Sequence, residues 1–586
     1  MASTTAMFTA LTGLNANARN LDVIGNNIAN VNTTAFKSSR MLFSTQFSLT
    51  NNVGTPPGDV NGGTNPFQTG LGVNTAGTQR NFNPGTIQPT GQPRDLAIDG
   101  DGFFVVRVGD RTTYTRNGAF NRSAQGDLTT VNGGRLLGFG VNEQFNINRG
   151  SLVPINIPLG SLTIAEATTQ ISFRGNLNAD GPIATQGSRV SLGGSPSQGL
   201  RAIATAVPSP ALGNIIEDTT LLVEIEDPLL VGSNTPLYTA GQRLQLRAAE
   251  KGGKTIPTIE LPITATTTVA DLRAFLTQSI GINTTNTTPN PDGLTPGVTL
   301  DPATGFLSIV GNVGTANDLR IDSTDLRLLS ASGQFIRHPN TTEKFNAATG
   351  ESIRTTFVVY DSLGTPVEVD ISAVLESRST AGTSWRYFVE SADDSDTNLA
   401  IATGLLTFDT DGRLSTTSVP PVSLDRAGTG AATPLIFTIG FGGGAENVTS
   451  LADDTSELAA TFRDGSPIGT LSGFAVGADG TVIGAFSNGL TRPLGQVALA
   501  TFSNPEGLVE IGDSLFGPGA NSGSAVVAQP GVLGAGQVVG GALELANVDI
   551  GEEFIKMISA STGYSASSRV IRSVDELMQQ LLVLGR

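Results

Sequence analysis

The stretch MFTALTGLNANARNLDVIGNNIANV, residues 7–31, decides how the chain begins and, with a counterpart at the other end, how it is organised. Apolar and small residues recur in it at alternating spacings of four and three. This is the repeat of a helix whose seam faces another helix. Phe8, Ile24 and Val31 widen the stripe. The seam positions are Met7, Leu11, Leu14, Ala18, Leu21, Gly25 and Ile28.

The counterpart is EEFIKMISASTGYSASSRVIRSVDELMQQLLVL, residues 552–584. Its seam positions are Met557, Ala560, Tyr564, Ser567, Ile571, Val574, Met578 and Leu581, widened by Phe554, Ile558, Leu577 and Leu584. For one such helix, an amphipathic helix docked on a globular core is the plainer interpretation. Two matching seams at opposite ends of a β-rich chain favour pairing of the ends with each other or with other copies.

The composition indicates several domains made largely of short strands. At 586 residues the chain exceeds a single core, and domain sizes suggest about three to five domains. Glycine (72) and proline (30) are plentiful, aromatic residues make up 6%, and charged residues only 15%. This mixture is typical of short strands joined by tight turns.

Charge and cysteine content exclude several classes of function. The net charge of -17, without a basic cluster, disfavours nucleic acid as a partner. Cysteine is absent, which rules out disulfides and thiolate sites. No segment reaches the roughly 18 apolar residues that span a bilayer, and the N-terminus lacks the basic and apolar regions of a signal peptide. We therefore expect a cytoplasmic protein, or one exported without a cleaved signal.

Between the ends, residues 94–140 alternate β-rich runs with turn dipeptides such as Asp99-Gly100 and Asn117-Gly118, which predicts hairpins. The same texture returns at residues 356–375 and 471–508. Residues 184–334 differ in composition and include one predicted short helix, TVADLRAFLTQSI (268–280), which indicates an inserted domain. Long Gly/Asn/Pro stretches lie just inside both terminal helices and are predicted to be connectors.

No residue is predicted to be catalytic, and none to bind a cofactor or a metal. The single histidine, His338, has neither a second histidine nor a triad around it. IDGDGFF (98–104) and FDTDGRL (408–414) resemble parts of a calcium loop but lack its later ligands. GFGGGAEN (440–447) lacks the Lys-Ser/Thr of a phosphate-binding loop. A glycosidase-like carboxylate pair stays open, without positive support.

Four stretches carry a resemblance to a known family. LTGLNANARNLDVIGNNIANVNTTAFKSSR (11–40) closely resembles the N-terminal signature of the bacterial flagellar rod and hook (axial) proteins. The run from residue 543 to 584 is similar to their C-terminal signature. DLAIDGDGFFVV (95–106) with residues 114–139 resembles their first β domain. VVYDSLGTPVEVD (358–370) and residues 491–516, together with the length of the chain, resemble the hook branch of the family.

The resemblance implies a multidomain, mainly β fold. A terminal α-helical coiled-coil domain would be formed by both chain ends, with two or three outer β domains nested by insertion. We expect the terminal domain at 1–35 and 545–586, extended connectors at 36–70 and 520–544, and a first β domain at 71–158 and 441–519. A second β domain is expected at 159–184 and 335–440, and an inserted outer domain at 185–334.

The function implied is that of a structural subunit of the flagellar hook, not an enzyme. Such subunits polymerise into a curved, flexible tube that transmits torque from rod to filament. The expected partners are copies of the chain, the rod, hook-cap and hook–filament junction proteins, and the flagellar type III export apparatus, with no membrane insertion. The expected location is outside the cell. A distal-rod protein and a secreted β-rich adhesin or carbohydrate-active protein are the alternatives.

Three groups of residues follow as expected sites. The N-terminal polymerisation seam comprises Leu11, Leu14, Ala18, Leu21, Ile24 and Ile28, and the C-terminal seam comprises Met557, Tyr564, Ile571, Val574, Met578 and Leu581. Asn26, Asn27, Asn30 and Asn32 are predicted to end the first helix, because asparagine tolerates turn conformations and its amide bonds freed backbone groups.

Overall fold

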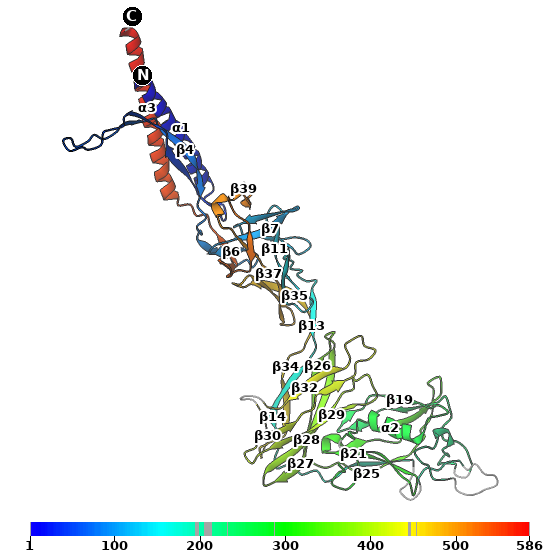
Figure 1. Ribbon diagram of the computed structural model, residues 1–586. Coiled ribbons are helices and arrows are strands. Elements are labelled where there is room, and N and C mark those ends of the chain that lie inside the picture. The colour runs from blue at the N-terminus through cyan, green and yellow to red at the C-terminus, as the bar shows by residue number, and fades with distance from the viewer. Residues whose placement is uncertain are drawn as a thin grey trace. The chain divides into compact units, whose positions relative to one another are not determined.

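The computed structural model describes residues 2–193, 199–203, 214–230, 233–285, 288–442, 447–452 and 454–584. It contains two compact units (Figure 1). The first combines Met1–Thr163 with Thr470–Arg586 and so contains both chain ends, and the second is the continuous stretch Ile164–Gly469. Strands dominate both units and long helices occupy both ends, which confirms the expected multidomain, mainly β fold.

Three α-helices are present in the described part of the chain: α1 (Ala2–Ala29), α2 (Val269–Ser279) and α3 (Ile550–Leu584). The short helix predicted at 268–280 is confirmed as α2, which begins with a capping box between Thr268 and Asp271. The start of α3 is fixed by Asp549, whose carboxylate accepts the Glu552 N–H at 3.0 Å. Over the described residues, no helix has both the length and the hydropathy needed to cross a membrane.

The strands of the first unit form one large sheet and several two-stranded ribbons. Phe82, Phe103 and Phe516 pack edge to face in its aromatic core, with ring centroids 5.5–5.9 Å apart. The strands are β1 (Ser39–Thr45), β2 (Ser48–Asn52), β3 (Phe67–Gly70), β4 (Val73–Arg80), β5 (Ile87–Pro89), β6 (Leu96–Asp99), β7 (Phe103–Val108), β8 (Arg111–Thr115), β9 (Asn121–Arg122), β10 (Leu128–Thr129), β11 (Arg135–Val141), β12 (Ile147–Pro154), β36 (Thr481–Phe486), β37 (Thr491–Val497), β38 (Leu499–Thr501), β39 (Val509–Gly512), β40 (Leu515–Gly517), β41 (Val526–Ala528), β42 (Gln537–Gly540) and β43 (Ala542–Glu544), with β13 (Thr163–Glu166) and β35 (Ser466–Val476) where the chain passes between the units.

The two segments expected to be extended connectors are largely paired strands. In residues 36–70, β1 pairs with β4 and β2 pairs with β3, both antiparallel. We call β2, β3 and the residues 53–66 between them the arm, which projects sideways from the terminal helices (Figure 1). In residues 520–544, β41, β42 and β43 pair with β38, β6 and β5. Both segments are therefore built into sheets rather than left as linkers.

Two large hydrophobic cores lie among the described residues of the second unit. One core includes Trp385 and Tyr387 on the five-stranded sheet β26–β30, and the other surrounds α2. The strands are β14 (Gln170–Asn176), β15 (Gly187–Leu192), β16 (Arg243–Leu246), β17 (Glu250–Lys251), β18 (Lys254–Thr255), β19 (Ile259–Pro262), β20 (Gly297–Asp301), β21 (Phe306–Val313), β22 (Leu319–Arg320), β23 (Leu326–Leu329), β24 (Phe335–Arg337), β25 (Thr342–Asn346), β26 (Ser352–Tyr360), β27 (Pro366–Ser379), β28 (Gly382–Glu390), β29 (Ala400–Phe408), β30 (Leu414–Ser418), β31 (Val422–Leu424), β32 (Leu435–Gly440), β33 (Val448–Thr449) and β34 (Glu457–Arg463).

Two of the expected domain boundaries differ from the structure. Residues from 441 onward were expected in the first β domain, but β33 and β34 pair with β14, which places them in the second unit. The insert was expected to end at 334, but β25 pairs with β15 and completes a sheet of the insert. Both differences arise because strand partners distant in sequence decide which domain a segment joins.

The insert is held to the sheet β26–β30 by contacts of several kinds. Leu399, which precedes β29, is buried in the core around α2. Lys251, on β17 of the insert, is buried, forms an ion pair with Glu390, and donates to the Gly281 carbonyl at 2.5 Å. Lys254 pairs with Asp370 at 2.6 Å. The insert therefore packs on its host through a buried, charged contact, and its removal would expose these partners.

We predict that Lys251→Ala destabilises the second unit by about 3 kcal/mol, because it leaves the largely buried Glu390 carboxylate with only its longer contact to Arg354, at 3.4 Å. Thermal unfolding followed by circular dichroism measures the effect. Lys344→Ala is the matched control, since the Lys344–Asp318 pair is about one-third exposed and should contribute less than about 1 kcal/mol. Equal, small effects of both substitutions would contradict the buried-contact interpretation.

Candidate functional site

Helices α1 and α3 lie side by side and run antiparallel (Figure 1). Asn27, near the end of α1, donates to the Glu553 carboxylate near the start of α3 at 3.1 Å. Further along, a Cβ on Gly563 would lie 3.0 Å from the Asn17 side chain, and one on Gly13 would lie 3.1 Å from Ser567 Oγ. Glycine at these positions allows the two backbones to approach closely.

The predicted N-terminal seam is only partly covered within one chain. Ile24 is 2% exposed, and Leu11 is 41% exposed. The remaining predicted positions are half-buried: Leu14, Ala18, Leu21 and Ile28. A single chain thus covers the half of the seam nearest the β domain more fully than the half near the N-terminus.

The predicted C-terminal seam is also only partly covered within one chain. Ala560 and Val574 are buried, and Tyr564 is 39% exposed. Met557, Ile571 and Met578 are half-buried, and the side chain of Leu581 lies outside the described residues. The seams meet each other in one chain, while their role in joining copies stays a prediction.

The sequence pattern predicts one apolar face on α3, whereas the structure shows two. Phe554, Ile558 and Leu577 were assigned to a widened seam, yet they are exposed, as is Ile555. Counting 100° per residue places Phe554 and Ile558 roughly opposite Ala560 and Ser567, which face α1. α3 therefore presents a second apolar surface that no described part of its own chain covers.

The four asparagines predicted to end α1 have different roles. Asn30 and Asn26 bond to each other in the last turn, with Asn30 Nδ2 3.0 Å from the Asn26 carbonyl oxygen. Asn32 is exposed in the following turn. Asn27 is buried instead, and its amide exchanges two hydrogen bonds with the backbone of Ser39, at 2.8 and 3.0 Å. Asn27 thus links α1, β1 and α3.

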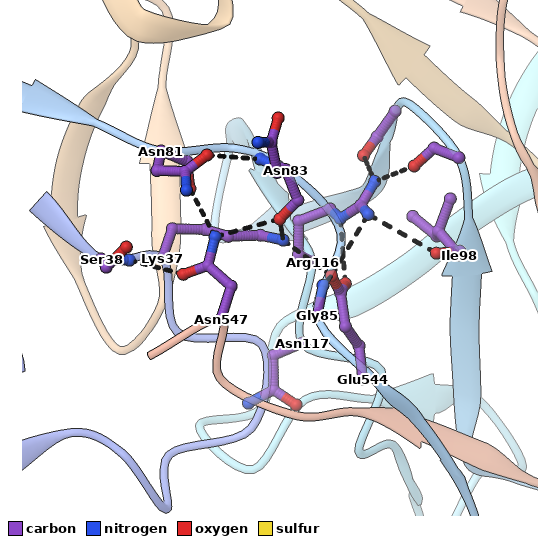
Figure 2. Close-up of polar contacts among 12 residues, drawn as sticks. Lys37, Ser38, Asn81, Asn83, Gly85, Ile98, Arg116, Asn117, Glu544 and Asn547 are labelled. Carbon is purple, nitrogen blue, oxygen red and sulfur yellow. Dashed lines mark hydrogen bonds and ion pairs between the residues drawn. The ribbon is translucent and has the colours of Figure 1, made fainter. Parts of the chain in front are cut away.

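A buried charge cluster lies where the segments from both chain ends meet the β domain (Figure 2). The carboxylate of Glu544, at the end of β43, accepts from Lys37 Nζ at 2.7 Å and from Arg116 Nε at 3.0 Å. The exposed fractions of the three side chains are 0%, 0% and 3%. We call Lys37, Arg116 and Glu544 the Glu544 cluster. It joins the segment after α1, the segment before α3 and the residue that follows strand β8 of the large sheet.

The remaining hydrogen-bonding groups of the cluster are satisfied. Lys37 also donates to the Asn83 carbonyl at 2.8 Å, and the Gly85 N–H donates to Glu544 at 2.8 Å. Arg116 donates to the carbonyls of Gly100 and Gly102, both at 2.8 Å. Such complete pairing is what allows charges to be buried.

Asn547 extends this junction by bonding to the backbone of two other segments of the chain (Figure 2). Its side-chain oxygen accepts the Ser38 N–H at 2.8 Å, and its nitrogen donates to the Asn81 and Asn83 carbonyls at 2.8 and 3.0 Å. The main chain adds the bond from Ala35 N–H to the Glu544 carbonyl at 2.8 Å. Both helices are thereby attached to the β domain through their inner ends.

Two opposing effects act on the pKa values of the cluster: burial disfavours the charged forms, and neighbouring opposite charges favour them. Burial opposes ionisation of Glu544, but the charges of Arg116 and Lys37 outweigh it and lower the pKa of the carboxyl. Burial, and then the charge of Arg116, lower the pKa of Lys37, and Glu544 offsets this only in part. The two cations consequently hold the carboxyl group of Glu544 in its charged form.

Lys37 and Glu544 lie in the two terminal stretches that resemble the family, but the sequence pattern predicts no role for either residue. One signal was present in the composition. Lysine occurs at only five positions in 586, and a lysine that serves only as a surface charge is replaceable, so each of the five is a candidate for a specific contact. Among the described residues, no group of three or more His, Asp or Glu side chains could hold a metal ion.

Four family models match parts of the chain. They are described as Flagella basal body rod protein (residues 7–37), Flagellar hook protein FlgE/F/G D1 domain (97–181), Flagellar basal body protein FlaE D2 domain (329–465) and Flagellar basal body rod FlgEFG protein C-terminal (539–584). The first and last models contain the two terminal seams. Residues 182–328, most of the insert, lie outside all four.

Full-length relatives are similar over the whole chain. The flagellar hook protein FlgE of Borreliella burgdorferi is 26% identical over 584 residues, and that of Escherichia coli is 24% identical over 582 residues, covering 99% and 98% of both chains. The crystal structure of Helicobacter pylori flagellar hook protein FlgE2 covers 77% of this chain and 98% of its own, with 16% identity and a TM-score of 0.36.

We predict that Glu544→Gln loosens the attachment of both helices, because two buried cations lose their counter-charge. The free energy of unfolding of the junction should fall by about 3–5 kcal/mol. Hydrogen exchange at the Gly85 and Leu545 amides should accelerate accordingly, since both lie at the junction. Glu510→Gln is the matched control, because the Arg80–Glu510 pair is 21% and 40% exposed. Unchanged exchange in Glu544→Gln would refute the anchoring role.

We also predict that the junction is acid-labile. The pKa of Glu544 is lower in the folded chain than its ordinary value of 4.5, so its ionisation stabilises the fold above pH 4.5. That contribution is lost as the pH falls below 4.5 and through the lowered pKa. The difference in amide exchange between the unmodified chain and Glu544→Gln should therefore shrink with acidification. A difference that is constant from pH 6 to pH 3 would contradict this.

Proposed function

The chain belongs to the bacterial flagellar rod and hook protein family, and we propose that its paired terminal helices are the surfaces through which copies assemble into the hook. Its function is that of a structural subunit of the flagellar hook. Relatives named as hook proteins that match almost the full length favour the hook over a distal-rod protein or an adhesin. The proteins of this family are structural rather than enzymatic.

The observation that carries the proposal is the amount of apolar side chain that the terminal region leaves exposed. On α3, Ile555 is 67% and Ile558 is 64% exposed, and Phe8 on α1 is 60% exposed. The arm adds Val60 and Phe67, also exposed. Concentrated apolar surface of this kind marks an interface, because water-exposed apolar patches on monomers are small.

The low content of charged residues is compatible with a tube that bends. With only 15% charged residues and many Thr, Ser, Asn and Gly, the chain has few strong fixed ion pairs to offer a neighbour. Contacts between such polar surfaces are individually weak. We infer that neighbouring subunits slide past one another at small energetic penalty, as a flexible torque-transmitting joint between rod and filament requires.

The finer partners and the route follow from membership of the family. We propose that the chain leaves the cell unfolded through the flagellar type III export apparatus, without a cleaved signal. It would then add beneath the hook cap outside the cell. The tube would contact the rod at one end and the hook–filament junction proteins at the other.

We predict that a variant ending at Asp549, which lacks α3, forms no hooks. Electron microscopy of basal bodies from a bacterium whose gene for this chain is deleted provides the measurement. The unmodified chain should restore hooks there, and the truncated one should not. To separate assembly from export, the purified variants are compared for growth on isolated hook fragments.

As a control, circular dichroism should show that the truncated variant keeps its β-rich units, because α3 contributes to none of their sheets. Hooks of normal length built from the truncated chain would overturn the proposed role of the terminal helices.

A further inference from the structure

An open groove of about 770 Å³ lies between α1, α3 and the base of the arm. Its floor and walls include Ala6 and Ala10 from α1, Ala566 and Val570 from α3, and Leu49 from β2. None of the described residues that line it is charged. Uncharged polar side chains of threonine, serine and asparagine complete the lining, so the groove suits an uncharged segment with an apolar face.

The small side chains of the walls define what kind of segment fits. Alanine at positions 6, 10 and 566, and Gly70 from the arm, leave the helix backbones accessible. Small side chains allow another helix to approach closely. Large side chains on that helix can then fill the space above them. The best-matched partner is a helix with large aliphatic or aromatic side chains along one face.

The first three turns of α3 carry such a face. Ile550, Phe554, Ile555 and Ile558 are exposed by 45%, 46%, 67% and 64%. At 100° per residue they share a sector of about 140°, which is a single helical stripe. We call these four residues the α3 stripe. It points away from α1, because Ala560 and Ser567 on the opposite side of α3 face α1.

A chain cannot fill its own groove with this stripe. Ile558 and Val570 lie on the same uninterrupted helix, and twelve residues of α-helix separate them by about 18 Å. The exposed apolar residues at the other end of α3 are less suitable. Any two of Leu577, Leu582 and Val583 are more than about 90° apart around the helix axis, so these residues form no common face.

We propose that the groove formed by α1, α3 and the arm receives the α3 stripe of a second copy of this chain. The inference rests on the proposed assembly of hook subunits and names the surfaces that meet. Groove and stripe are different patches of one chain, so the contact is heterologous. Each copy that docks its stripe still offers a groove, and the contact repeats in an open-ended series rather than closing into a dimer.

Disulfide cross-linking tests the pairing directly, because the chain has no cysteine of its own. The double variant Ile558→Cys/Val570→Cys is assembled into hooks, oxidised and run on a non-reducing gel. A disulfide needs Cα atoms about 4.4–6.8 Å apart, so the two introduced thiols cannot join within one helix. Every disulfide formed therefore joins two copies, and we expect a ladder of dimers, trimers and higher species.

The matched control is Ile558→Cys/Arg572→Cys. Arg572 is exposed at nearly the same height on α3 as Val570, but it lies on the side of the stripe and does not line the groove. This pair should give no ladder. Each single variant should remain monomeric on the gel.

Hooks that form from the double variant but give no ladder would refute the proposal, while the proposed hook function would stand. Dimers from Ile558→Cys alone would refute it as well, since stripe would then meet stripe. Should the double variant fail to assemble, the two single variants are co-assembled with excess unmodified chain. A dimer that appears only when both are present supports the pairing, and its absence refutes it. Failure of the unmodified chain to build hooks would instead refute the proposed function.

Discussion

The attachment of both chain ends to one β domain is the constraint on which the rest of the first unit depends. Glu544 meets Lys37 and Arg116 in a site almost closed to water, where each of the two cations contacts the same carboxylate. The cluster holds the segment that follows α1 against the segment that precedes α3. The antiparallel register of the helices, from Asn27 beside Glu553 to Gly13 beside Ser567, follows from that starting point.

Periodicity along the chain was sufficient to locate the terminal helices, α2 and the β-rich middle, because each depends on local repeat and turn chemistry. It was insufficient for features that depend on distant partners. Phe554 and Ile558 fit a widened seam at heptad spacing, and only the direction of α1 shows that they face elsewhere. Lys37 and Glu544 are separated by 507 positions, and no local pattern relates them. Asn27 was grouped with Asn26, Asn30 and Asn32 by composition, although its burial gives it a different role.

The second unit shows the same limit in its domain borders. Residues 441–465 look like a continuation of the following β domain, yet β34 pairs with β14 across almost the whole unit. The insert was recognised by its composition, but its dependence on the host was not. Lys251 and Leu399 each reach from one core to the other, so the sequence break at residue 184 is not a break in packing. Insertions of this kind share a cooperative interface with their host.

The separation of 507 residues between Lys37 and Glu544 also has a consequence for the order of folding. Closing a loop of that length in an unfolded chain carries an entropic penalty of about 5–6 kcal/mol on a logarithmic dependence. A single ion pair does not offset such a penalty. Once the strands between them have formed their sheets, the same two segments are brought close together and the remaining search is short. Native topology of this type, with many non-local contacts, folds slowly. We therefore expect α1 to pair with α3 late in the folding of the chain, after the intervening strands have formed their sheets.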